Sequence, residues 1–315
     1  MRELRIVFMG TPEFAVSVLD GIIAEGYNVA GVITAPDKPA GRGRKIQESA
    51  VKKYAEKAGL RILQPTNLKS PEFLKELEEI NPNVQVVVAF RMLPKAVWNF
   101  PEFGTFNLHA SLLPQYRGAA PINWAIINGE TATGVTTFYL DEKIDTGEVI
   151  LQTEVPIEED DNAGSLHDKL MTTGTQLVLA TLDQIRQDIV KTLPQEEFAL
   201  LNEAPKLTRE NTKVNWELSN QQIYNFIRGL DPYPGSWCYL EEEGKQSTVK
   251  IFGSRLLEED HNLTLGTLIQ ENKQLKVAVV NGFLEILEIQ LPGKKKMRTR
   301  DLLNGYKFAP EAKLL

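Results

Sequence analysis

The sequence has one cysteine, Cys238, and three histidines among 315 residues. A single thiol cannot form an internal disulfide, and no metal-ligand spacing appears around it. No apolar run approaches the ~18 residues of a membrane helix, and the first residues lack the long apolar segment of a signal peptide. We therefore expect a cytoplasmic protein that associates with no membrane and holds no metal.

Charge is spread unevenly along the chain. The net charge is −7 and 42% of residues are hydrophobic, which is ordinary globular composition. Residues 206–315 hold 16 basic and 14 acidic side chains, whereas residues 1–205 hold 19 and 28. Residues 34–53 are a basic stretch within that acidic part. Local basic segments on an acidic body can bind one anionic partner, although solvated surface charge is the alternative.

The first part of the chain alternates between short apolar segments and amphipathic ones. The apolar segments predict strands at 4–9, 27–34, 84–90, 104–109, 133–140 and 148–155. The amphipathic segments predict helices at 12–25, 46–58, 70–80, 119–128 and 165–187, the first of them capped by Thr11. This alternation predicts an α/β fold with a Rossmann-like, mostly parallel sheet and helices on both faces.

The pattern changes near residue 190. Residues 190–205 show no periodicity, which is typical of a linker. One more helix is predicted at 219–229, followed by short strands at 236–240, 248–254, 264–270, 274–280 and 283–290. They predict a small OB-like β-barrel or another compact β domain. We thus predict a catalytic domain over 1–189, a linker over 190–205 and a C-terminal β domain over 206–315.

Polar residues follow several predicted strands, and ligands of open α/β sheets bind at the carboxyl ends of strands. The segment Gly10–Phe14 lacks the G-x-G-x-x-G pattern, which argues against a dinucleotide site. Asn107 and His109 end one strand and point to the same face, because side chains alternate along a strand. Asp145 lies in an Asp-Thr-Gly segment and would orient His109, although such a segment is also common in turns.

No serine or cysteine nucleophile has a convincing setting, since G-x-S-x-G is absent around Ser111. An Asn–His–Asp set suits a reaction that polarises a carbonyl and moves a proton without a covalent intermediate.

These motifs resemble those of the folate-dependent formyltransferases. The resemblance rests on Asn107-Leu-His109, on Ser111-Leu-Leu-Pro-Gln-Tyr-Arg-Gly-Ala-Ala-Pro121 and on Asp145-Thr-Gly147. Over nearly its full length the chain is similar to the branch that formylates methionyl-tRNA. That similarity includes the loop Pro36–Lys45, the segment Ile227–Gly235 and the segment Leu291–Met297.

The resemblance implies transfer of a formyl group from 10-formyltetrahydrofolate to the amino group of methionyl-initiator tRNA, with no protein partner. It implies Asn107, His109 and Asp145 as catalytic residues. The folate-binding residues it implies are Phe90, Arg91, Met92, Leu93, Ser111, Leu112, Leu113 and Pro114. The tRNA-binding residues it implies are Lys38, Arg42, Arg44, Lys45, Lys206, Lys294, Lys295, Lys296 and Arg298. Arg42 is expected to contact the acceptor end of the tRNA, in a loop that orders on binding.

Two positions depart from the family pattern, since Gln85 and Arg91 stand where relatives commonly have an acidic residue and a glycine. Two other functions stay open. One is formyl transfer to a small amine, such as glycinamide ribonucleotide or an amino sugar, by an enzyme expected to lack the basic 36–45 insertion. The other is a non-catalytic α/β nucleotide-binding module, which would need a phosphate loop.

Overall fold

The computed structural model describes residues 1–40, 45–196 and 200–315, which form two compact units. Unit 1 consists of Met1–Gly118, Thr133–Pro156 and His167–Glu203. Unit 2 consists of Ala119–Ala132, Ile157–Leu166 and Ala204–Leu315. The predicted domain boundaries at 189 and 206 stay predictions.

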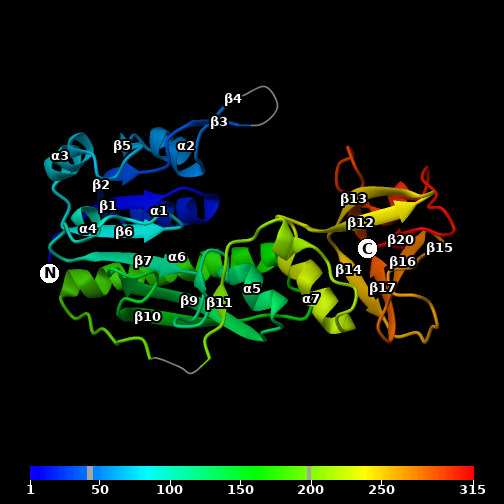
Figure 1. Ribbon diagram of the computed structural model, residues 1–315. Coiled ribbons are helices and arrows are strands. Elements are labelled where there is room, and N and C mark those ends of the chain that lie inside the picture. The colour runs from blue at the N-terminus through cyan, green and yellow to red at the C-terminus, as the bar shows by residue number, and fades with distance from the viewer. Residues whose placement is uncertain (41–44, 197–199) are drawn as a thin grey trace. The chain divides into compact units, whose positions relative to one another are not determined.

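Unit 1 is built on a seven-stranded sheet (Figure 1). In spatial order its strands are β10 (Val149–Pro156), β9 (Ala132–Tyr139), β7 (Thr105–His109), β6 (Val84–Val88), β1 (Arg5–Gly10), β2 (Asn28–Ile33) and β5 (Ile62–Leu63). The strands β7, β6, β1, β2 and β5 run parallel, whereas β9 runs antiparallel to β7. The predicted mostly parallel α/β sheet is confirmed.

Helices cover both faces of this sheet. They are α1 (Glu13–Ala24), α2 (Ala50–Lys57), α3 (Pro71–Ile80), α4 (Lys95–Trp98) and α6 (Ala163–Gln187). Met9 of β1 and Val87 of β6 pack in one cluster with Leu77 of α3 and Val97 of α4. Leu108 of β7 points to the opposite face, where it approaches Gly174 of α6 so closely that an added Cβ would lie 2.8 Å away.

The start of α2 differs from the prediction of a helix over 46–58. A hairpin of β3 (Lys38–Ala40) and β4 (Lys45–Gln47) precedes the helix. Ser49 is the N-cap, because its side chain accepts a hydrogen bond from the Lys52 N–H at 3.0 Å. The predicted cap at Thr11 is also wrong, since Pro12 occupies the N-cap of α1 without a side-chain hydrogen bond.

Unit 2 contains a β-barrel preceded by two packed helices, α5 (Pro121–Ile127) and α7 (Asn220–Leu230). Gly229 permits their close approach, because a Cβ there would lie 2.7 Å from Ile127. The barrel strands are β12 (Ser236–Glu242), β13 (Lys245–Ile251), β14 (Ser254–Leu257), β15 (Leu268–Glu271), β16 (Gln274–Val279), β17 (Gly282–Ile286), β18 (Glu288–Gln290), β19 (Met297–Arg298) and β20 (Lys313–Leu314). Shorter elements of the chain are β8 (Arg117–Gly118), β11 (Glu203–Ala204), η1 (Glu210–Thr212) and α8 (Thr299–Leu302).

The barrel closes because two chain segments bend from one antiparallel sheet into the other. The predicted strand 248–254 is interrupted at Phe252–Gly253, and the predicted strand 283–290 is interrupted at Leu287, whose N–H donates to Gly253. A bridge between Thr267 and Lys313 joins the remaining edges. The C-terminal barrel prediction is thus confirmed, although two of its strands are divided.

Cys238 lies in the core of this barrel with no exposed surface. Burial in apolar surroundings raises the pKa of its thiol far above the usual value, so the reactive thiolate is almost absent at neutral pH. We expect native protein to resist alkylation by iodoacetamide, whereas protein in denaturant takes up one equivalent. Labelling of native protein at the unfolded rate, measured by mass spectrometry, would contradict this placement.

No helix among the described residues is both long and apolar enough to cross a membrane.

Candidate active site

Asn107 and His109 stand at the carboxyl end of β7, in the middle of the sheet. Asn107 pairs with Val87 of β6, so its side chain lies on the sheet face that carries α3 and α4. The Asn107 Oδ1 is buried and has no hydrogen-bond partner among the described residues. A buried polar atom without a hydrogen bond destabilises the folded protein by about 1–3 kcal/mol. Such an atom is explained where a bound ligand supplies the missing hydrogen bond.

The His109 imidazole is held between a backbone carbonyl and a carboxylate. Its Nε2 lies 2.8 Å from the Tyr116 carbonyl oxygen, which can only accept, so Nε2 carries a proton. Its Nδ1 lies 3.8 Å from the Asp145 Oδ2, which is within ion-pair range and beyond hydrogen-bond length. His109 is 6% exposed. A second proton at Nδ1 would therefore face a carboxylate in a largely water-free site.

Asp145 is held by groups from two other segments of the chain. The Gly118 N–H donates to Asp145 Oδ2 at 3.0 Å, and the Gln195 side-chain amide donates to the carbonyls of Asp145 and Gly147 at 2.9 and 2.8 Å. A Cβ at Gly147 would lie 1.7 Å from the Tyr139 carbonyl oxygen, so only glycine fits there. The Asp-Thr-Gly segment is thus both a turn and the support of a carboxylate beside His109.

The loop after β7 packs into the protein. Ser111 is fully buried and donates to the Gln115 carbonyl at 2.6 Å, while the Leu113 N–H donates to Thr136 at 3.1 Å. Leu112 and Pro114 are half-buried. None of the residues from Ser111 to Pro114 lines the pocket described next.

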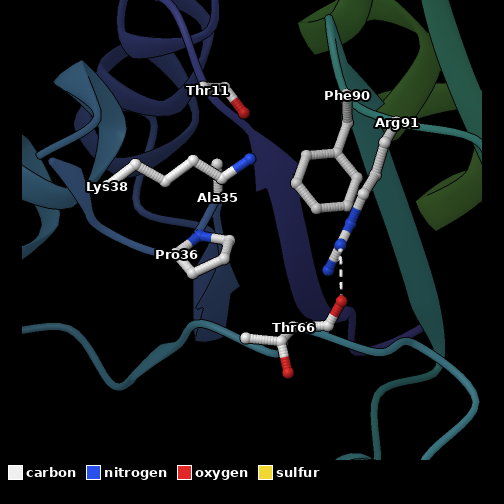
Figure 2. Close-up of a pocket in the computed structure, with 7 residues that line it drawn as sticks. All are labelled: Thr11, Ala35, Pro36, Lys38, Thr66, Phe90 and Arg91. Carbon is white, nitrogen blue, oxygen red and sulfur yellow. Dashed lines mark hydrogen bonds between the residues drawn. The ribbon is translucent and has the colours of Figure 1, made fainter. Parts of the chain in front are cut away.

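A pocket of about 340 Å³ opens at the carboxyl ends of β1, β2 and β6 (Figure 2). Its lining residues are Thr11, Ala35, Pro36, Lys38, Thr66, Phe90 and Arg91. Figure 2 shows the Phe90 ring and the Arg91 side chain along one wall, with the Lys38 side chain extending toward them from the other. The lining thus offers an aromatic face and two cations without a carboxylate, which suits a planar, anionic molecule.

Arg91 is part of the pocket wall. Its guanidinium donates to the Thr66 carbonyl at 3.0 Å and to the Pro65 carbonyl, and it lies 5.6 Å from the Phe90 ring centre. Ala89 ends β6 with φ of 47°, a conformation that non-glycine residues rarely adopt. Gln85 lies at the other end of β6, fully buried and bonded to Thr105. Of the two departures from the family pattern, only Arg91 therefore faces the pocket.

The other predicted folate residues lie apart from the pocket lining. Met92 is 72% exposed, whereas Leu93 is buried in the core between the sheet and α3.

The predicted tRNA residues fall into four groups, the first of which is Lys38 in the pocket lining. Arg42 and Arg44 lie outside the described residues, and Lys45 is described only by its backbone. Lys206, Lys294, Lys295 and Arg298 are exposed and make no ion pair among the described residues. Lys296 differs, because it pairs with Asp231 at 3.0 Å and with Glu288 at 2.7 Å.

Sequence reasoning missed two groups that shape this site. One is the Tyr116 carbonyl, a backbone atom that no side-chain motif identifies. The other is Gln195, which lies in the predicted linker and also accepts from Arg117 at 2.6 Å. A linker without periodicity gives no signal for such a residue.

No group of three or more His, Cys, Asp or Glu that could hold a metal occurs within the described parts of the chain.

An open α/β sheet with polar side chains at its carboxyl edge is the framework of a ligand-binding protein. A family profile described as "Formyl transferase" matches residues 4–182, and one described as "Formyl transferase, C-terminal domain" matches residues 206–307. The chain belongs to the formyl transferase family.

Close relatives extend over the whole chain. A methionyl-tRNA formyltransferase of Flavobacterium johnsoniae is 57% identical over 314 residues, covering 100% of both chains. Another, from Bacteroides thetaiotaomicron, is 53% identical over 317 residues, covering 99% of this chain and 98% of the relative.

Two solved structures show the same fold at low identity. An N-formyltransferase from Helicobacter canadensis, in complex with folinic acid and dTDP-3-aminofucose, has a TM-score of 0.66 at 22% identity, covering 93% of this chain and all of the other. HypX from Aquifex aeolicus has a TM-score of 0.68 at 18% identity, covering 96% of this chain and 49% of the other.

Proposed function

We propose that this enzyme transfers the formyl group of 10-formyltetrahydrofolate to the amino group of methionyl-initiator tRNA. The product, N-formylmethionyl-tRNA, starts translation in the cytoplasm. One observation supports the reaction class: Asn107 and His109 share the carboxyl end of β7, and the Asp145 carboxylate lies 3.8 Å from the His109 Nδ1. The full-length similarity to methionyl-tRNA formyltransferases supports the choice of acceptor.

The donor supplies an activated formyl group when it is bound. In this proposal the Asn107 amide donates a hydrogen bond to the formyl oxygen, where negative charge develops as the amine attacks. His109 accepts and returns the proton that the amine loses. Asp145 holds the imidazole and stabilises its charged form. No metal and no protein partner is part of this proposal.

His109 needs a rearrangement before it can act, since both ring nitrogens already face protein groups. Nε2 is engaged by the Tyr116 carbonyl, and Nδ1 faces Asp145. We propose that acceptor binding displaces the Tyr116 carbonyl and that the ring proton moves from Nε2 to Nδ1 beside Asp145, so that the lone pair of Nε2 can accept the amine proton.

The pocket beside β6 fits the donor by the chemistry of its lining. A folate carries flat ring systems and a carboxylate tail, and the pocket offers the Phe90 ring with the Arg91 and Lys38 cations. We propose that Phe90 and Arg91 hold the donor in the pocket. Outside its lining, the exposed Met92 would contact a part of the donor that extends beyond the pocket, whereas the buried Leu93 would only support the loop. Ser111 to Pro114 support the site by packing behind it.

Arg91→Ala is expected to raise the Michaelis constant for the formyl donor roughly 10- to 150-fold, because a charge-assisted hydrogen bond contributes about 1.5–3 kcal/mol. The maximal rate at saturating donor should change little. Arg91→Lys should recover part of the affinity, since it keeps the charge. Arg61→Ala is the matched control, because Arg61 lies outside the pocket lining and its guanidinium lies 3.6 Å from the Glu79 carboxylate. If the Michaelis constant for the formyl donor were unchanged in Arg91→Ala, Arg91 would not be part of the donor site.

The acceptor would be held by the basic groups Lys206, Lys294, Lys295 and Arg298, together with Arg42, Arg44 and Lys45 of the 36–45 segment, whereas Lys38 of the predicted set faces the donor pocket. Such contacts read phosphate and shape rather than base sequence. Lys296 is the least suited of the predicted set, since two carboxylates already neutralise it.

Two binding assays separate this proposal from its rivals. In a gel-shift assay the protein should bind charged initiator tRNA, whereas a formyltransferase for small amines should not. A folate should bind with a fluorescence change, whereas a nucleotide-binding module without catalysis should not bind it. Binding of neither ligand would contradict the proposed function.

A further inference from the structure

The loop Asp231–Gly235 of unit 2 presents an aromatic side chain to solvent. Tyr233 is 81% exposed, although its neighbours Asp231 and Gly235 are buried. Large aromatic side chains are usually covered, and those left exposed are enriched where a partner binds.

The loop backbone is held firmly on both sides of this ring. The Asp231 carboxylate accepts from Asn162 at 2.9 Å and from Lys296 at 3.0 Å. The Lys250 ammonium donates to the Pro234 carbonyl at 2.6 Å. Prolines flank Tyr233 and restrict the backbone further. Because the backbone is already ordered, a partner that contacts the ring loses little conformational entropy on binding.

The charge around the ring is positive. Lys296 joins the Lys294–Lys296 turn to the loop through its bond to Asp231, and it also pairs with Glu288. Lys296 therefore offsets one of the two negative charges of Asp231 and Glu288. Lys294 and Lys295 make no ion pair among the described residues and remain exposed. An exposed ring on this loop, together with two exposed lysines of the turn that is bonded to the loop, is a combination that binds nucleotides by stacking and phosphate contact.

We infer that Tyr233 stacks on a nucleobase of the acceptor tRNA, while Lys294 and Lys295 contact phosphates beside that base. The inference rests on the proposed function, since it assigns a position on unit 2 to the tRNA substrate. Stacking requires an accessible base, so the partner is a nucleotide at a helix end, in a loop or in a single strand.

The test replaces Tyr233 in the full-length enzyme and measures tRNA affinity and formyl transfer together. Tyr233→Ala should weaken initiator-tRNA binding and raise its Michaelis constant roughly 5- to 100-fold, the range found for loss of one base–aromatic stack. The maximal rate at saturating tRNA should change little. Tyr233→Phe should bind like the wild type, because it keeps the ring. Tyr233→Leu should bind like Tyr233→Ala, because it keeps apolar area without an aromatic face.

Leu263→Ala is the matched control, since Leu263 is an exposed apolar side chain of the same unit, 41% exposed. It should leave tRNA affinity unchanged. Salt gives a second criterion: Tyr233→Ala should lower affinity at every salt concentration without changing the salt slope, because the tyrosine carries no charge.

Wild-type affinity in Tyr233→Ala, or wild-type affinity in Tyr233→Leu, would overturn the inference while the proposed function stands. A wild-type enzyme that neither binds nor formylates initiator tRNA would overturn the proposed function, and this inference with it.

Discussion

Asn107→Ala is expected to lower the turnover number for formyl transfer about 10²- to 10³-fold, which is the usual loss on removing one oxyanion donor. His109→Ala should cause a loss of about 10²- to 10⁴-fold, because it removes the group that moves the proton. Donor affinity should survive in both variants, since neither residue lines the pocket. Single-turnover kinetics at saturating substrates, with folate binding measured in parallel, checks both expectations.

Asn107→Asp is the informative control for this result. It keeps the size of the side chain and removes its N–H donors, so it should be as inactive as Asn107→Ala. Both variants should stay folded, because the Asn107 Oδ1 makes no hydrogen bond among the described residues that substitution would break. Near-normal turnover in Asn107→Asp would show that the amide does not donate to the formyl oxygen.

Neutralising Lys294 and Lys295 together is expected to raise the Michaelis constant for tRNA severalfold and to flatten its salt dependence. Each lost phosphate contact should lower the slope of log affinity against log salt by about one. The maximal rate should not change, because unit 2 contributes affinity in the proposed function. If the slope of log affinity against log salt were unchanged in Lys294→Ala/Lys295→Ala, this turn would not be part of the tRNA-binding surface.

Lys296→Ala should behave differently, although it lies next in sequence. Its substitution leaves the Asp231 carboxylate, whose side chain is 9% exposed, without its cationic partner. Loss of such a partner costs about 1–3 kcal/mol, so the melting temperature should fall while the salt slope stays near that of the wild type. The contrast separates a residue that binds tRNA from one that stabilises the loop.

The sheet and the barrel could be predicted from the sequence because their strands are short, apolar and regularly spaced. Errors arose where a single residue changes the path of the chain. Ser49 caps α2 and leaves Lys45–Gln47 free to form a strand, and Leu287 bends a predicted single strand into two. Hydrophobic periodicity carries no information on either event.

The candidate site could be predicted in part for a similar reason. Period-two alternation places Asn107 and His109 on one face, but it gives no distance to Asp145, which belongs to a different loop. The Tyr116 carbonyl and the Gln195 amide could not be predicted from the sequence. The first is a backbone atom, and the second lies in a segment without hydrophobic periodicity. The pocket also combines residues that follow three different strands and the segment around Thr66, which no local motif connects.

The most direct test of the central claim is a formyl-transfer assay with purified enzyme, 10-formyltetrahydrofolate and a panel of acceptors. Methionyl-initiator tRNA should be formylated with a kcat/KM at least about 10³-fold above that for glycinamide ribonucleotide or an amino-sugar nucleotide, since the small amines lack the phosphate and base contacts of a tRNA. Asn107→Ala should abolish most of this activity in the same assay. Equal or preferential formylation of a small amine would contradict the account.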